Sequence, residues 1–92
     1  MNEPTAITAR ITGRVQGVAF RAWAESEARD RGLAGWIRNE TDGSVTTLIE
    51  GARDRVEDML AALHRGPPRA RVAHIETAPA TPEGRDGFDI RR

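Results

Sequence analysis

The residues best suited to chemistry lie in Gly13-Arg14-Val15-Gln16-Gly17-Val18-Ala19-Phe20-Arg21, which joins a strand-like segment to a helix-like one. Its two glycines permit positive φ angles and a close approach of the backbone to a ligand. The N–H groups of this loop and of the first helical turn could converge on one phosphate-sized anion, beside the guanidinium of Arg21. The same spacing also fits a plain strand-to-helix connection with Arg21 in solvent. Spacing alone leaves both interpretations open.

The other reactive side chains give weaker signals. The 92 residues contain no cysteine and no lysine, which excludes disulfides, thiolate nucleophiles and lysine Schiff bases. His64 and His74 have no ligand spacing around them, so we predict neither a metal site nor a cofactor. The opening stretch also differs from the glycine-rich motifs that bind nucleotides. We expect Trp23 and Trp36 to fill the core rather than a binding site.

The charge balance restricts the partners. Fourteen arginines offset fourteen acidic residues, so the broad positive surface of a nucleic-acid-binding protein is not expected. The chain has no apolar run long enough to span a membrane and no secretion leader, so we predict no membrane partner and a cytoplasmic location. We expect a monomer with one domain over residues 6–92, preceded by a short N-terminal tail over residues 1–5.

Two elements must position the opening stretch. Residues 6–13 alternate between apolar and polar side chains, which predicts a half-buried strand. A helix is expected from about residue 21 to residue 31, with Gly32 ending it. Its buried stripe is formed by Phe20, Ala24 and Ala28.

The second half of the chain repeats this alternation of strand and helix. Residues 35–39 and 44–50 are predicted to form antiparallel strands joined at Asp42-Gly43. The helix after Gly51 has the clearest pattern, with apolar residues at helical spacing, and it ends at Gly66. Those apolar residues are Val56, Met59, Leu60 and Leu63.

The last third of the chain gives the weakest pattern. Residues 70–77 form a poor strand pattern, because Val72 and Ile75 are three apart and would not share a face. A loop is expected over residues 78–87, before a short terminal strand at residues 88–90.

The order of these elements predicts the fold class. It reads strand, helix, strand, strand, helix, strand, with one extra strand at the end. We therefore expect an α+β fold with a split βαβ arrangement, in which a mainly antiparallel sheet carries both helices on one face.

Two stretches also resemble one known family. The opening stretch meets every specified position of the first acylphosphatase signature, G-x-V-Q-G-V-x-F-R. Gly35-Trp36-Ile37-Arg38-Asn39, which leads to Asp42-Gly43-Ser44-Val45, is similar to the second, a G-W-V-x-N strand entering a D-G hairpin. The resemblance runs from about Ala6 to the end. It departs mildly from the family at Ile37, where valine is commoner, and at Trp23, where a smaller aromatic is usual.

The resemblance implies an activity and a set of site residues. An acylphosphatase-like domain over residues 6–92 would be a ferredoxin-like α/β sandwich that hydrolyses acyl phosphates without a metal, releasing a carboxylate and inorganic phosphate. Arg21 would clamp the phosphoryl group and Asn39 would position the attacking water. The backbone that cradles the phosphoryl oxygens would come from Val15, Gln16, Gly17, Val18, Ala19 and Phe20.

Two other functions remain as alternatives. Acylphosphatase-like domains also occur inside larger carbamoyl-phosphate-handling maturation proteins, so a non-catalytic module that binds phosphate or carbamoyl phosphate is the main one. RNA binding on a ferredoxin-like sheet is disfavoured, because tyrosine is absent and the strands lack paired exposed aromatics.

Overall fold

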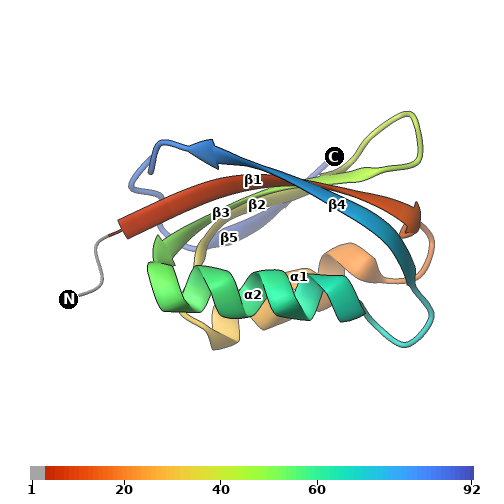
Figure 1. Ribbon diagram of the computed structural model, residues 1–92, viewed down its shortest axis with the longest axis horizontal. Helices are drawn as coiled ribbons and strands as arrows, with labels where there is room; N and C mark the ends of the chain where they lie inside the picture. Colours follow the sequence, from red (N-terminus) through yellow and green to blue (C-terminus); the bar gives the residue numbers. More distant parts are fainter. Residues whose placement is uncertain (1–3) are drawn as a thin grey trace.

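The computed structural model describes residues 4–92, which form one mixed sheet with both helices on the same face (Figure 1). The sheet order is β4-β1-β3-β2-β5, and every pair is antiparallel except β2 and β5. This confirms the predicted α+β, ferredoxin-like fold with an extra terminal strand. No helix in residues 4–92 is long and apolar enough to cross a membrane. The elements are β1 (Pro4–Arg14), α1 (Phe20–Asp30), β2 (Ala34–Asn39), β3 (Val45–Ala52), α2 (Arg53–Arg65), β4 (Arg71–Ala80) and β5 (Phe88–Arg91).

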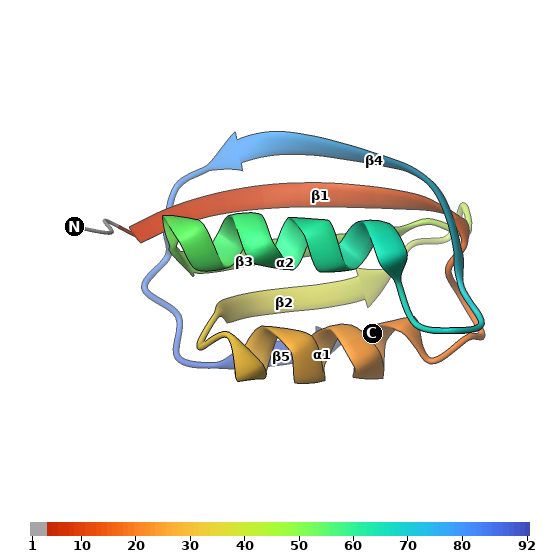
Figure 2. The ribbon, with the colours of Figure 1, turned by 60° about the horizontal axis from the view of Figure 1, so that its bottom comes forward.

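Both helices bury the apolar faces that their spacing predicted. α1 lies over β2 and β5, and α2 lies over β1, β3 and β4 (Figure 2). The core forms between the helices and the sheet, where the apolar faces leave water. The helical residues buried there are Phe20, Ala24 and Ala28 from α1 and Val56, Met59, Ala62 and Leu63 from α2, while Leu60 is partly buried.

The end of α1 shows how the sequence stops a helix. Gly32 has a φ of 67°, which glycine adopts without the steric cost of a Cβ atom. Its N–H donates to the carbonyl of Arg29 at 3.0 Å, and the N–H of Leu33 donates to that of Ala28 at 2.9 Å. This pair of bonds is a Schellman motif, and it satisfies carbonyls that the end of the helix would leave unpaired.

The prediction that Val72 and Ile75 face opposite sides of the sheet is wrong. Both side chains pack against the core. A β-bulge causes this, because Gly13 pairs with Val72 while Thr12 pairs with His74, leaving Ala73 as an extra residue. A Cβ atom on Gly13 would lie 2.2 Å from the Arg71 carbonyl oxygen, so the close approach of the two strands requires glycine here.

The expectation that Trp36 fills the core is also wrong. On β2 its neighbour Ile37 faces the helices and is fully buried, so Trp36 points to the other, open face of the sheet. There its ring lies against the guanidinium groups of Arg38 and Arg91, at 4.9 Å and 4.7 Å from the ring centroid. Trp23, in contrast, packs against the edge of the core as expected.

All five strands are longer than expected, and β1 and β4 are extended the most. β1 begins at Pro4 rather than residue 6, because Pro4 and Thr5 already lie in register with β3. The rest of the expected tail, residues 1–3, lies outside the described residues. β4 continues to Ala80, where it pairs with Ala6, so the last loop covers residues 81–87 instead of 78–87. The carboxylate of buried Glu50 holds this loop by accepting hydrogen bonds from three of its backbone N–H groups.

Candidate active site

The candidate site lies at the edge of the sheet where three strands end. β1 and β2 are both antiparallel to β3, so they run in the same direction, and β5 runs parallel to β2. Their C-terminal ends therefore meet at one edge of the sheet. This topology brings the loop after β1, the last residue of β2 and the end of β5 together, although they are far apart in the sequence.

The turn into α1 gives the site its anion-binding character. Ala19, the residue before the helix, has a φ of 62° and a ψ of 27°, a left-handed conformation that costs a non-glycine residue about 1–2 kcal/mol. Its side chain cannot cap the helix, and the first helical turn contains no acidic residue. The N–H groups of that turn lack intrahelical acceptors and carry partial positive charge. An anion is the ligand that suits this end of α1.

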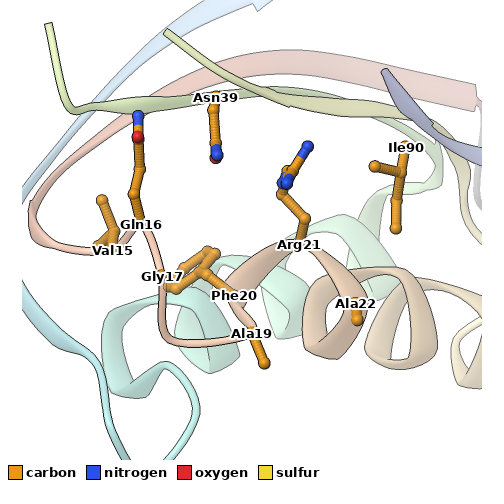
Figure 3. A pocket seen from close by; sticks show the side chains of 9 residues that line it. All are labelled: Val15, Gln16, Gly17, Ala19, Phe20, Arg21, Ala22, Asn39 and Ile90. Atoms are coloured by element: carbon orange, nitrogen blue, oxygen red, sulfur yellow. The ribbon is translucent and has the colours of Figure 1, made fainter. Parts of the chain in front are cut away.

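The same turn borders a small pocket (Figure 3). Its volume of about 220 Å³ is below the usual 300–1,000 Å³ of pockets that bind drug-sized ligands. A phosphoryl group with a small substituent matches this size better than a nucleotide does. The lining residues are Val15, Gln16, Gly17, Ala19, Phe20, Arg21, Ala22, Asn39 and Ile90.

Arg21 extends from the first turn of α1 toward the space between Asn39 and Ile90 (Figure 3). Within residues 4–92 its guanidinium has no carboxylate partner, and its one hydrogen bond is a long one of 3.5 Å from Nη1 to the carbonyl oxygen of Arg91. Its charge is therefore available to a ligand. Arginines that do pair with carboxylates in this fold are Arg10, Arg29, Arg31, Arg38 and Arg85.

Asn39 ends β2 and directs its side chain into the pocket from the sheet side (Figure 3). Its Oδ1 atom is buried and has no hydrogen-bond partner among the described residues. Buried polar atoms in native proteins are almost always paired with protein or water. The pocket therefore has an acceptor that a bound water or ligand would satisfy.

The side chain of Gln16 ties the loop to the β2–β3 hairpin. Its Nε2 donates to the carbonyl oxygens of Glu40 and Ser44, both at 2.9 Å. Glu40 directly follows Asn39 in the chain. The two hydrogen bonds therefore hold the loop after β1 close to the Asn39 side chain.

Asp42 stiffens the hairpin to which Gln16 binds. Its Oδ1 accepts hydrogen bonds from the backbone N–H and the hydroxyl of Ser44, at 2.9 Å and 2.6 Å. Its other oxygen, Oδ2, forms a 2.6 Å ion pair with Arg10 on β1. The hydrogen bonds to Ser44, and after them Arg10, hold the pKa of this carboxyl well below its usual range.

The structure brings most of the predicted site residues together. Arg21, Asn39 and the predicted loop residues line one pocket, with the exception of Val18, which is in the core and is 5% exposed. Only the backbone of Val18 could therefore take part in phosphate binding. His64 and His74 are exposed, and no group of three His, Asp or Glu side chains in residues 4–92 could hold a metal ion.

Three features of the site were missed from the sequence. These are the Gln16 side-chain tether, Ala22 and Ile90. The alternation of Phe88 and Ile90 does place both on one face of β5, but only the parallel pairing with β2 shows that this face borders the pocket.

Comparisons with known proteins identify the family of this chain. The family model for acylphosphatase matches residues 7–90. The chain is 49% identical over 82 residues to an acylphosphatase of Natronomonas pharaonis, with 89% of each chain covered. It is 52% identical over 80 residues to one of Azoarcus sp., with 87% of this chain and 82% of that one covered. The crystal structure of acylphosphatase from Bacillus subtilis has a TM-score of 0.93 and 35% identity, covering 96% of this chain and 99% of that one. The chain therefore belongs to the acylphosphatase family and is a hydrolase of acyl phosphates.

Proposed function

We propose that the pocket binds the phosphoryl group of the acyl phosphate between Arg21 and the backbone N–H groups of residues 15–20, and that Asn39 positions the attacking water. The observation that carries this proposal is the buried Oδ1 of Asn39, which has no hydrogen-bond partner in residues 4–92 and lines the same pocket as Arg21, whose guanidinium has no carboxylate partner there. An anion and a water would satisfy these two groups together.

The groups that line this pocket match the requirements of acyl phosphate hydrolysis. The water oxygen forms a bond to phosphorus while the bond from phosphorus to the acyl oxygen breaks, and the electron pair leaves with the carboxylate. A proton of the water passes to a phosphoryl oxygen, which yields inorganic phosphate. Phosphoryl transfer depends mainly on positioning and charge stabilisation, and a carboxylate is a good leaving group. A planar guanidinium can donate two parallel hydrogen bonds to the phosphoryl oxygens.

Asn39 suits the water-positioning role because its amide has both an acceptor and a donor. The Oδ1 atom would accept from the water and hold its oxygen toward phosphorus. The tether from Gln16 to the hairpin keeps this amide close to the loop that would hold the phosphoryl group. In this arrangement no histidine, cysteine or pair of carboxylates is needed.

Hydrolysis of acetyl phosphate and benzoyl phosphate in the presence of a chelator tests the proposal. We expect wild-type turnover, a loss of about 100-fold or more in kcat/KM for Arg21→Ala, and a lower kcat for Asn39→Ala with an unchanged inhibition constant for phosphate. Arg55→Ala is the matched control, because Arg55 is exposed on α2 and does not line the pocket. A folded wild-type protein that binds phosphate without turnover would favour the binding module. If Asn39→Ala weakened phosphate binding as much as turnover, the water-positioning role would be wrong.

Phosphate binding can also be measured without turnover. A ligand at 100 times its Kd stabilises the folded state by about 2.7 kcal/mol. Inorganic phosphate should therefore raise Tm in the wild type and in Arg55→Ala, and raise it much less in Arg21→Ala. If phosphate did not change Tm of the wild type, the assignment of the loop as the phosphate-binding site would be wrong.

We further propose that the enzyme acts as a monomer and without a metal. The groups that the proposed mechanism uses all come from one chain, so the mechanism does not require a second copy. Sedimentation at a mass of 10.1 kDa, rather than a multiple of it, tests the monomeric state. The cytoplasmic location stays a prediction.

A further inference from the structure

Ile90 gives the pocket an apolar side that the catalytic groups do not use. It is the one large hydrophobic side chain exposed among residues 4–92, at 39%. Its partner in register on β2, Ile37, is 0% exposed, and Phe88, on the same face of β5, is 1% exposed. This face of β5 is therefore buried except where it borders the pocket. Ile90 is the residue of this face that is exposed, and it lines the pocket.

The pocket has two chemically different sides (Figure 3). The loop with Val15 and Gln16 lies at one side, Ile90 lies at the other, and the guanidinium of Arg21 extends between them. An acyl phosphate also has two different ends, a charged phosphoryl group and an acyl group. If the phosphoryl group occupies the loop and Arg21, the acyl group can extend toward Ile90.

We propose that Ile90 contacts the acyl group and makes the enzyme prefer acyl phosphates whose acyl group is apolar. The inference rests on the proposed binding of the phosphoryl group by the loop and Arg21. An apolar acyl group loses water contact against the Ile90 side chain, which is favourable. A charged acyl group would lose hydration there without gaining a partner.

Ile90 is held in place from the open face of the sheet. The next residue, Arg91, places its guanidinium 4.7 Å from the centroid of the Trp36 ring. On the pocket side, Arg21 Nη1 donates to the Arg91 carbonyl at 3.5 Å. Trp36 therefore acts as a positioning residue, because it fixes the end of β5 without touching the pocket.

The ratio of kcat/KM for benzoyl phosphate to that for acetyl phosphate tests the contact. Ile90→Ala removes three carbons from a side chain that is 39% exposed, so it should lower this ratio about 10-fold in total. The inhibition constant for phosphate should not change, because the loop and Arg21 remain. Ile90→Val should keep the ratio within about 2-fold. Ile75→Ala is the control, because Ile75 packs against the core from β4, the outer strand on the other side of the sheet from β5.

A second variant guards against a folding defect. Ile90→Thr keeps the β-branched shape that suits a strand but adds a hydroxyl, and it should also lower the ratio. Trp36→Ala should also lower the ratio of kcat/KM for benzoyl phosphate to that for acetyl phosphate, but by less than Ile90→Ala does. Equal losses on both substrates in Ile90→Ala and Ile90→Thr would overturn the acyl contact and leave the phosphate site intact. Wild-type protein that turned over neither substrate would instead contradict the proposed function, and this inference with it.

Discussion

Replacing Gln16 by methionine tests whether the tether between loop and hairpin matters. Methionine matches the length of glutamine but has no donor, so both 2.9 Å hydrogen bonds to the carbonyls of Glu40 and Ser44 are lost. A hydrogen bond contributes about 1 kcal/mol net, so the two together contribute about 2 kcal/mol to the free energy of unfolding. In a domain of this size, that loss should lower Tm by about 8–16 °C.

The effect on catalysis should exceed what unfolding explains. The tether sets the distance between the loop after β1 and Asn39, and a displacement of about 1 Å in a reacting geometry can cost about 100-fold in rate. We therefore expect kcat of Gln16→Met to fall by about 10- to 100-fold at a temperature where the variant is fully folded. Phosphate inhibition should change less, because the loop backbone and Arg21 remain.

Two measurements decide the outcome. Thermal unfolding followed by circular dichroism gives Tm, and benzoyl phosphate hydrolysis at low temperature gives kcat. Gln16→Glu is the matched variant, because it keeps the shape of glutamine but turns the donor into a third acceptor against two carbonyls. Gln16→Glu should lower Tm and kcat at least as much as Gln16→Met does. Wild-type Tm and kcat in Gln16→Met would refute the reasoning, because the loop would then hold its position without the two hydrogen bonds.

Two further predictions concern the frame around the site. Gly13→Ala should destabilise the fold by about 3 kcal/mol or more, because its Cβ would clash with the Arg71 carbonyl and a φ of 121° strains alanine. Urea unfolding measures this, with Gly84→Ala as a control whose φ of 72° also strains alanine but whose Cβ meets open space. Asp42→Asn should be less stable than wild type near neutral pH. Because the folded pKa of Asp42 is lowered, its stabilisation is present above its unfolded value near 4 and is lost as pH falls below it. The gap between the unfolding midpoints of the two proteins should narrow as pH falls from about 4 to about 3, and a pH-independent gap would contradict the charge effect.

The regular parts of the fold were predictable because their signals are local. The buried stripes of α1 and α2 and the glycine that ends α1 follow from spacing within one element, and they are confirmed. The face of β2 was not predictable, since Trp36 and Ile37 are adjacent and apolar, and either could point to the core. Only the register with the neighbouring strands decides between them.

The errors in the last third of the chain have a different cause. The bulge opposite Gly13 adds one residue to β4, and no pattern within β4 reveals it. The place of β5 beside β2 depends on a long connection, so the position of Ile90 at the pocket was not visible either. Gln16 was expected to contribute its backbone, but its side chain bonds to carbonyls that lie 24 and 28 residues further on.

The strand order has a consequence for how the enzyme becomes active as it folds. β3 lies between β1 and β2, so the loop after β1 and Asn39 on β2 cannot reach their final distance until β3 has inserted between the two earlier strands. Pairings between segments so distant in the chain form late, because the entropy of closing long loops must be overcome first. The two helices can form before the sheet is complete, whereas the pocket cannot. We therefore expect catalytic activity to require the insertion of β3, and to be absent from a partly folded chain that has formed only its helices.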